Sequence, residues 1–139
     1  MANAFGGYME VGHHKTDREH LLLFVNIAQL SNAHSPEDAL RAIKDYHSNF
    51  ILHCANEEIF MRQIKNPTIN EHIIEHIKMK ETITRYISKL SDYENASFSY
   101  ISNILDKELS VHLTDWDSYV FKRSKLYDPN FDIESGFGL

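Results

Sequence analysis

The fold is decided by residues 53–76, HCANEEIFMRQIKNPTINEHIIEH, in which two helical segments meet at Asn66-Pro67. Proline disfavours a helical conformation in the residue before it and lacks the backbone N–H of a helix interior, so this pair separates two helices. We expect the first helix to end at about Gln63 and the second to begin at Thr68 or Asn70. On either side of the break, metal-binding side chains recur four residues apart: His53 with Glu57, and His72 with His76.

This spacing of four residues places both members of each pair on one face of a helix, on successive turns. Counted from the break, the first pair lies about ten residues back and the second five to nine residues on. At 1.5 Å of rise per residue, the two pairs reach nearly the same height in antiparallel neighbouring helices. The four side chains are therefore predicted to face one another.

Two further helices complete an all-α, up-down-up-down four-helix bundle. Asp17 is a plausible N-cap for the first helix, and Ser35-Pro36 combines an N-cap with a proline at the first helical position. Short connections between the helices favour antiparallel neighbours. We expect one domain over residues 1–139, with an N-terminal arm over 1–16, helices over 17–30, 35–63, 68–90 and 97–125 within the bundle 17–125, and an irregular tail over 126–139.

The composition is that of a small soluble domain in the cytoplasm. The sequence has no apolar run long enough to cross a membrane and no signal-peptide pattern at its N-terminus. A single cysteine, Cys54, leaves no intrachain disulfide and is typical of a reducing compartment. The net charge of −6, without a dense basic stripe, argues against nucleic acid as a partner.

The other two helices each carry further candidate ligands. On an ideal α-helix, His112 and Asp117 point about 140° apart, so they are expected to straddle a wide site rather than grip one atom. Imidazole and carboxylate ligands together suit iron, manganese, cobalt or zinc. Five histidines and two carboxylates on four helices predict a two-metal site inside the bundle. Its predicted metal ligands are His20, His53, Glu57, His72, His76, His112 and Asp117.

This pattern resembles the hemerythrins, and its flanking residues resemble the bacterial single-domain branch, over about residues 8–125. The resemblance implies two iron ions with a bridging oxo or hydroxo group, both bridged by Glu57 and Asp117. It assigns three of the histidines to one iron and two, His20 and His53, to the other. The second iron then has an open position, where dioxygen binds reversibly for transport, storage or delivery.

Three residues depart from the family pattern. Glu19 stands where glutamine is common, Glu108 replaces a tryptophan one turn before His112, and Cys54 replaces an aromatic residue. We expect none of them to touch a ligand, and Cys54 to be buried between helices. An apolar pocket for dioxygen is also predicted, although ordinary packing of the core would explain its residues equally well. Its predicted lining is Leu23, Phe24, Phe50, Leu113 and Trp116.

Other polar residues have simpler interpretations. Glu58 and Glu75 are expected to face solvent, with a hydrogen bond to a ligand imidazole as the alternative. The histidines outside the pattern are interpreted as surface or helix-capping residues: His13, His14, His34 and His47.

Two other functions remain open on the sequence. The same open iron could serve a di-iron oxidase, peroxidase or nitric-oxide-handling enzyme, and the chain ends could report the oxidation state as an oxygen or redox sensor. The ferritin-like pattern requires Glu-x2-His pairs on two helices, and the predicted helices contain none. The expected partners are dioxygen and an oxygen-consuming or reductase protein, with the chain as a monomer.

Overall fold

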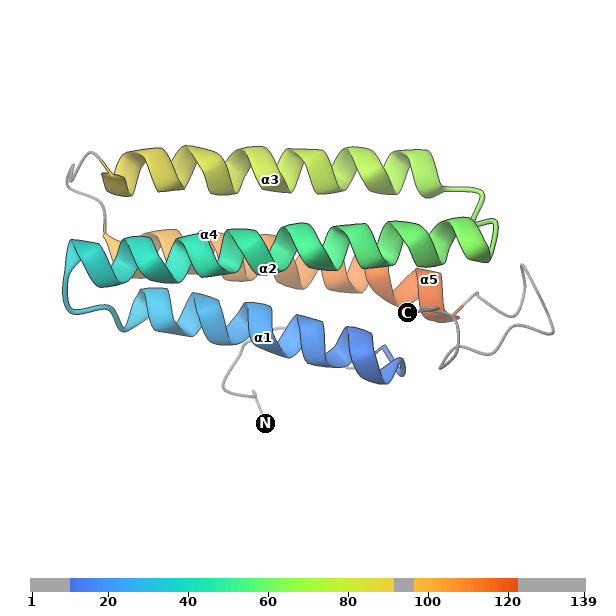
Figure 1. Cartoon of the computed structure of the whole chain (residues 1–139), viewed down its shortest axis with the longest axis horizontal. Helices are drawn as coiled ribbons and strands as arrows, with labels where there is room; N and C mark the ends of the chain where they lie inside the picture. The colour runs from blue at the N-terminus through green and yellow to red at the C-terminus, as the bar shows by residue number, and fades with distance from the viewer. Residues whose placement is uncertain (1–10, 92–96, 123–139) are drawn as a thin grey trace.

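The computed structural model describes residues 11–91 and 97–122, and all regular elements in these two ranges are helical. Figure 1 shows the long helices lying side by side, with the first two connections between them at opposite ends of the bundle. The all-helical bundle predicted from the sequence is therefore confirmed. Its elements are α1 (His14–Ser31), α2 (Pro36–Gln63), α3 (Ile69–Ser91), α4 (Phe98–His112), the π-helix η1 (Leu113–Asp117) and α5 (Ser118–Lys122).

Side-chain caps fix the starts of three helices. The Ser35 hydroxyl accepts from the Asp38 N–H at 3.1 Å, with Pro36 in the first turn as predicted. Ser97 caps α4 in the same way. The first helix begins earlier than Asp17, because the His13 side chain accepts from the N–H of Thr16.

Asp17 was therefore wrongly predicted as the N-cap of the first helix. Its carboxylate instead accepts from the N–H groups of Val11 and Gly12, at 2.7 and 3.3 Å. These bonds fold the preceding chain back onto the first turn of α1. Residues 14–16 of the predicted arm belong to α1.

The predicted break at Asn66-Pro67 is confirmed. Lys65 has φ of 55°, a left-handed conformation that ends α2. The Asn66 side-chain oxygen then accepts from the N–H and the hydroxyl of Thr68, at 2.9 and 3.0 Å. This Asx turn reverses the chain, and α3 follows directly.

The bundle encloses an apolar core on both sides of the polar residues at its centre. In the described part of the chain, α1 packs against α2 and α4, α3 packs against α2 and α4, and η1 adjoins α4 and α5. The larger cluster includes Leu23, Phe24, Phe50 and Cys54, all buried. The smaller cluster, from the other end of the bundle, is Phe60, Met61, Ile64, Val120 and Phe121.

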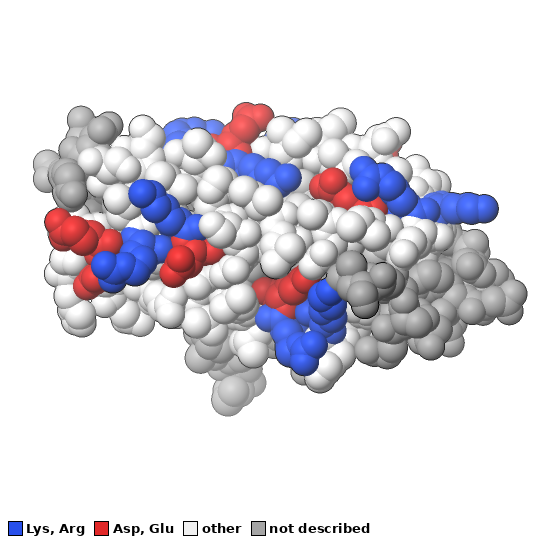
Figure 2. Space-filling model, viewed as in Figure 1, with Lys and Arg blue, Asp and Glu red and all other residues white. Residues whose placement is uncertain are grey.

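Several predictions fall outside the described residues: the arm over 1–10, the turn at 92–96, the end of the fourth helix after Lys122 and the tail over 126–139. Among the described helices, none combines the length and apolarity that a membrane span requires. Figure 2 shows one face of the molecule, on which positive and negative side chains lie close together and alternate with uncharged surface.

Candidate metal centre

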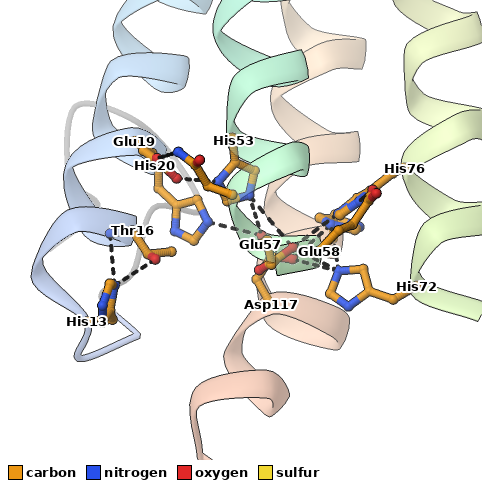
Figure 3. A network of polar contacts seen from close by, with 12 residues as sticks. His13, Thr16, Glu19, His20, His53, Glu57, Glu58, His72, His76 and Asp117 are labelled. Atoms are coloured by element: carbon orange, nitrogen blue, oxygen red, sulfur yellow. Dashed lines mark hydrogen bonds and ion pairs between the residues drawn. The ribbon is translucent and has the colours of Figure 1, made fainter. Parts of the chain in front are cut away.

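The seven predicted ligand residues meet at the centre of the bundle, all buried. They come from α1, α2, α3, α4 and η1, and Figure 3 shows the labelled ones among them converging. Within the described residues they form two groups, each with ligand atoms within 4.8 Å of one another. The first group is Glu57, His72, His76, His112 and Asp117, and the second is His20, His53 and Asp117.

Asp117 joins the two groups through its two carboxylate oxygens. Its Oδ1 lies 2.8 Å from His112 Nε2 and 3.0 Å from His72 Nε2. Its Oδ2 lies 3.0 Å from His20 Nε2 and 3.2 Å from His53 Nε2. A carboxylate shared in this way between two histidine sets has the arrangement of a bridging ligand.

Glu57 has one satisfied oxygen and one unsatisfied oxygen. Its Oε1 lies 3.0 Å from His72 Nε2 and 3.1 Å from His76 Nε2. His53 Nε2 is 3.9 Å from the same oxygen. Its Oε2 is buried without a hydrogen-bond partner among the described residues. Because a buried carboxylate oxygen without a partner is costly, this atom fits a position reserved for a cation.

The predicted divergence of His112 and Asp117 was wrong, because the chain between them is not α-helical. Residues 113–117 form one turn of π-helix. The i→i+5 bonding of a π-helix brings residues five apart onto one face, and π-helical turns of this kind are frequent at functional sites. Asp117 therefore lies directly over His112 and also reaches the second group.

Two outer carboxylates orient ligand imidazoles. Glu19 Oε1 lies 2.9 Å from His53 Nδ1, and Glu58 Oε2 lies 2.8 Å from His76 Nδ1. Because carboxylates only accept, both Nδ1 atoms carry hydrogen, while the two Nε2 atoms contact the central carboxylates Asp117 and Glu57. The expectation that no departure from the family pattern touches a ligand was thus wrong for Glu19. For Glu58, the alternative of a bond to a ligand imidazole is confirmed.

Charged neighbours lower the pKa of both central carboxylates, Glu57 and Asp117, and raise the pKa of one histidine in each group. Burial and Asp117 raise the pKa of Glu57, but His72 and His76 outweigh them and hold it at about 2. Burial lowers the pKa of His72, yet Glu57 and Asp117 raise it to about 10. Burial also lowers the pKa of His53, but hydrogen bonds to Asp117 and Glu19 outweigh it and raise that pKa well above its usual value.

Aromatic residues adjoin the centre. The Phe50 ring centroid lies 6.2 Å from that of His53 and 6.1 Å from that of His76, and the half-buried Trp116 lies 5.3 Å from His72. Leu23, Phe24 and Leu113 are buried, as both a pocket lining and ordinary core packing would require. The predicted lining of an oxygen pocket by these five residues stays a prediction.

Two hollows on the surface flank Trp116. One, of about 430 Å³, lies between α3 and α4 and includes Glu108 and His112 in its wall. The other, of about 360 Å³, includes His72 and Tyr119. Each hollow therefore extends from the surface to a histidine of the larger ligand group. Sequence reasoning did not predict them, because they depend on the spacing between α3 and the fourth helical segment.

The sequence left two interpretations of His13, a surface residue or a helix-capping residue, and the first was wrong. His13 caps α1, as the other interpretation held, and it is 1% exposed. Its ring stacks on Phe121 at 5.2 Å. His14 and His34 are exposed and His47 is half-buried, and none of the three joins either ligand group.

Comparisons of the chain with protein-family models, with curated proteins and with solved structures found no match.

Proposed function

We propose that the seven side chains hold two iron ions and that the chain is a hemerythrin-type protein that binds dioxygen reversibly, for transport, storage or delivery in the cytoplasm. The observation that carries this proposal is the shared position of Asp117, with one oxygen on each histidine group. The buried, unpartnered Oε2 of Glu57 supports it, since a second metal would satisfy that atom.

The donor set fits two divalent ions of this kind. Neutral imidazoles and carboxylates suit iron better than calcium or thiolate-preferring metals. Two carboxylates offset part of the charge of two divalent ions, which lowers the free-energy cost of burying them. In the proposed assignment, His72, His76 and His112 would hold one iron, His20 and His53 would hold the other, and Glu57 and Asp117 would serve both. The up-down-up-down topology belongs to the same proposal and is supported by Figure 1, in which the α1–α2 and α2–α3 connections lie at opposite ends of the bundle.

The smaller group would leave its iron one ligand short, with an open position for dioxygen. Bound iron would supply that position and the electrons for reversible oxygenation. The chain's own contribution is to fix five imidazoles, bridge two sites and limit water. Phe50 packs beside a histidine of each group, and every ligand is at most 3% exposed.

The experiment is an optical titration of anaerobically reduced, iron-loaded protein. An oxygen-dependent visible band that disappears when oxygen is removed, over several cycles, supports a carrier. Rapid one-way conversion to the oxidised protein contradicts reversible binding.

A second candidate is an oxidase, peroxidase or nitric-oxide-handling enzyme at the same centre. The hollows beside Trp116 favour it, because they extend from the surface to His72 and His112. Steady consumption of a reductant together with oxygen, peroxide or nitric oxide would support the enzyme. A stable oxygenated form without turnover would exclude it.

A further inference from the structure

The smaller ligand group is tied to a hydrogen-bonded chain that begins outside it. Asn56 Nδ2 donates to Glu19 Oε2 at 2.7 Å, and Glu19 Oε1 accepts from His53 Nδ1, 2.9 Å away. Asn56 is 8% exposed and the Glu19 side chain 16%. Both carboxylate oxygens of Glu19 therefore accept a hydrogen bond in a largely buried setting, one from His53 and one from Asn56.

These hydrogen bonds join two helices. Asn56 and His53 are three residues apart on α2, while Glu19 reaches across from α1. Glu19 directly precedes His20, the other histidine of the smaller group. The same contact thus orients His53 and fixes the register of α1 that presents His20.

We propose that Glu19, held by Asn56, is a positioning residue that sets the metal affinity of the His20–His53 group. The proposal rests on the metal binding proposed above. Glu19 keeps hydrogen on His53 Nδ1, so that Nε2 offers its lone pair to the metal, and its negative charge makes the imidazole a stronger donor. Asn56 prevents the carboxylate from turning away into solvent.

The chemistry of an amide makes Glu19→Gln a sharp test. An amide has one accepting oxygen and one donating nitrogen, whereas both neighbours of Glu19 donate. The Glu19→Gln variant can therefore satisfy His53 or Asn56 but not both. Adding Asn56→Asp supplies an acceptor for the amide nitrogen, which restores every hydrogen bond and moves the negative charge one side chain outward.

Glu58 provides a comparison within the same centre. Its Oε2 contacts His76 Nδ1 at 2.8 Å, and the structure gives that carboxylate no second donor corresponding to Asn56 within the described residues. The oxygen of an amide can serve this single contact. We therefore expect Glu58→Gln to weaken metal binding less than Glu19→Gln does.

The experiment measures the affinity for Co²⁺ alone, by anaerobic competition with a chromophoric chelator, together with the visible cobalt spectrum. Glu19→Gln is expected to weaken the weaker-bound cobalt by about 10- to 100-fold, the usual effect of losing such an outer partner. Asn56→Asp alone should also weaken it, because two carboxylates then face each other. The double variant should recover most of the affinity and the wild-type spectrum, so the two substitutions are strongly non-additive.

Glu75→Gln is the matched control, since Glu75 lies beside His76 in sequence and pairs with Lys78 at 3.6 Å. Its cobalt affinity should equal that of the wild type. Unchanged affinity in Glu19→Gln would overturn the proposal, and so would a double variant as weak as the single ones. If Glu19→Gln fails to fold by circular dichroism, Asn56→Asp and the double variant decide in the same way. A wild-type chain that binds no cobalt would instead overturn the proposed function itself.

Discussion

Replacing His76 with alanine should remove the metal pair. His76 is fully buried, with Nε2 3.1 Å from Glu57 and Nδ1 2.8 Å from Glu58. The variant loses one imidazole donor of the larger group, releases Glu58 from its partner and leaves Glu57 with His72 at 3.0 Å. Among the described residues, the larger group would then keep two histidines and two carboxylates: His72, His112, Glu57 and Asp117.

The expected loss of metal affinity follows from the binding free energy that one ligand contributes. Structural zinc sites with four ligands bind with about 10–16 kcal/mol, or roughly 3 kcal/mol per ligand. Since about 1.4 kcal/mol corresponds to a factor of ten, one ligand is worth about a hundredfold in Kd. His76→Ala is therefore expected to weaken the larger group by about a hundredfold or more, with the bridging carboxylates disturbed as well.

The assay is metal content after gel filtration, combined with competitive cobalt titration. His47→Ala is the matched control, because His47 lies on α2, is half-buried and belongs to neither group. It should retain wild-type metal content. Retention of both metals at wild-type affinity in His76→Ala would refute the ligand assignment, provided that circular dichroism shows a folded helical protein.

Three further results are expected. Co²⁺ should quench the fluorescence of Trp116, the single tryptophan, because its ring lies 5.3 Å from His72, whereas Zn²⁺ should not; equal responses to the two ions would contradict this placement. Cys54 should resist thiol reagents until the protein unfolds, because its side chain is buried and burial, with the charge of Glu57, raises its pKa; fast native labelling would count against a buried thiol. Metal-free protein should lose stability as the pH falls from 4.5 through about 2, because Glu57 becomes protonated in this range. It should also lose stability as the pH rises from 6.5 through about 10, because His72 loses its proton there. Thermal unfolding between these extremes should show a maximum near pH 4.5–6.5, and a flat profile would contradict the charge balance of the centre.

The sequence predicted the parts of the site that depend on local spacing. Both ends of α2 and the start of α3 follow from the Ser35-Pro36 start and the Asn66-Pro67 break, whose backbone effects act within a few residues. Once that break was placed, the common height of Glu57 and His76 followed from the helical rise, and the 3.1 Å contact confirms it.

Contacts that depend on helix rotation and irregular turns were not predictable in this way. Glu19 and His53 are separated by 34 positions, so their contact requires the relative rotation of α1 and α2. The π-turn between His112 and Asp117 adds a residue to one helical turn, and no Pro or Gly marks it in LTDWD. The buried position of His13 depends on Phe121, which lies more than a hundred residues later.

The central claim is that two iron ions held by these seven side chains bind one dioxygen reversibly. The most direct measurement is the iron content and the oxygen released under vacuum, determined on the same reduced and oxygenated sample. The account predicts two iron ions per chain and one dioxygen released per iron pair. Fewer than two iron ions per chain at saturation, or an iron pair that releases no oxygen, would contradict it.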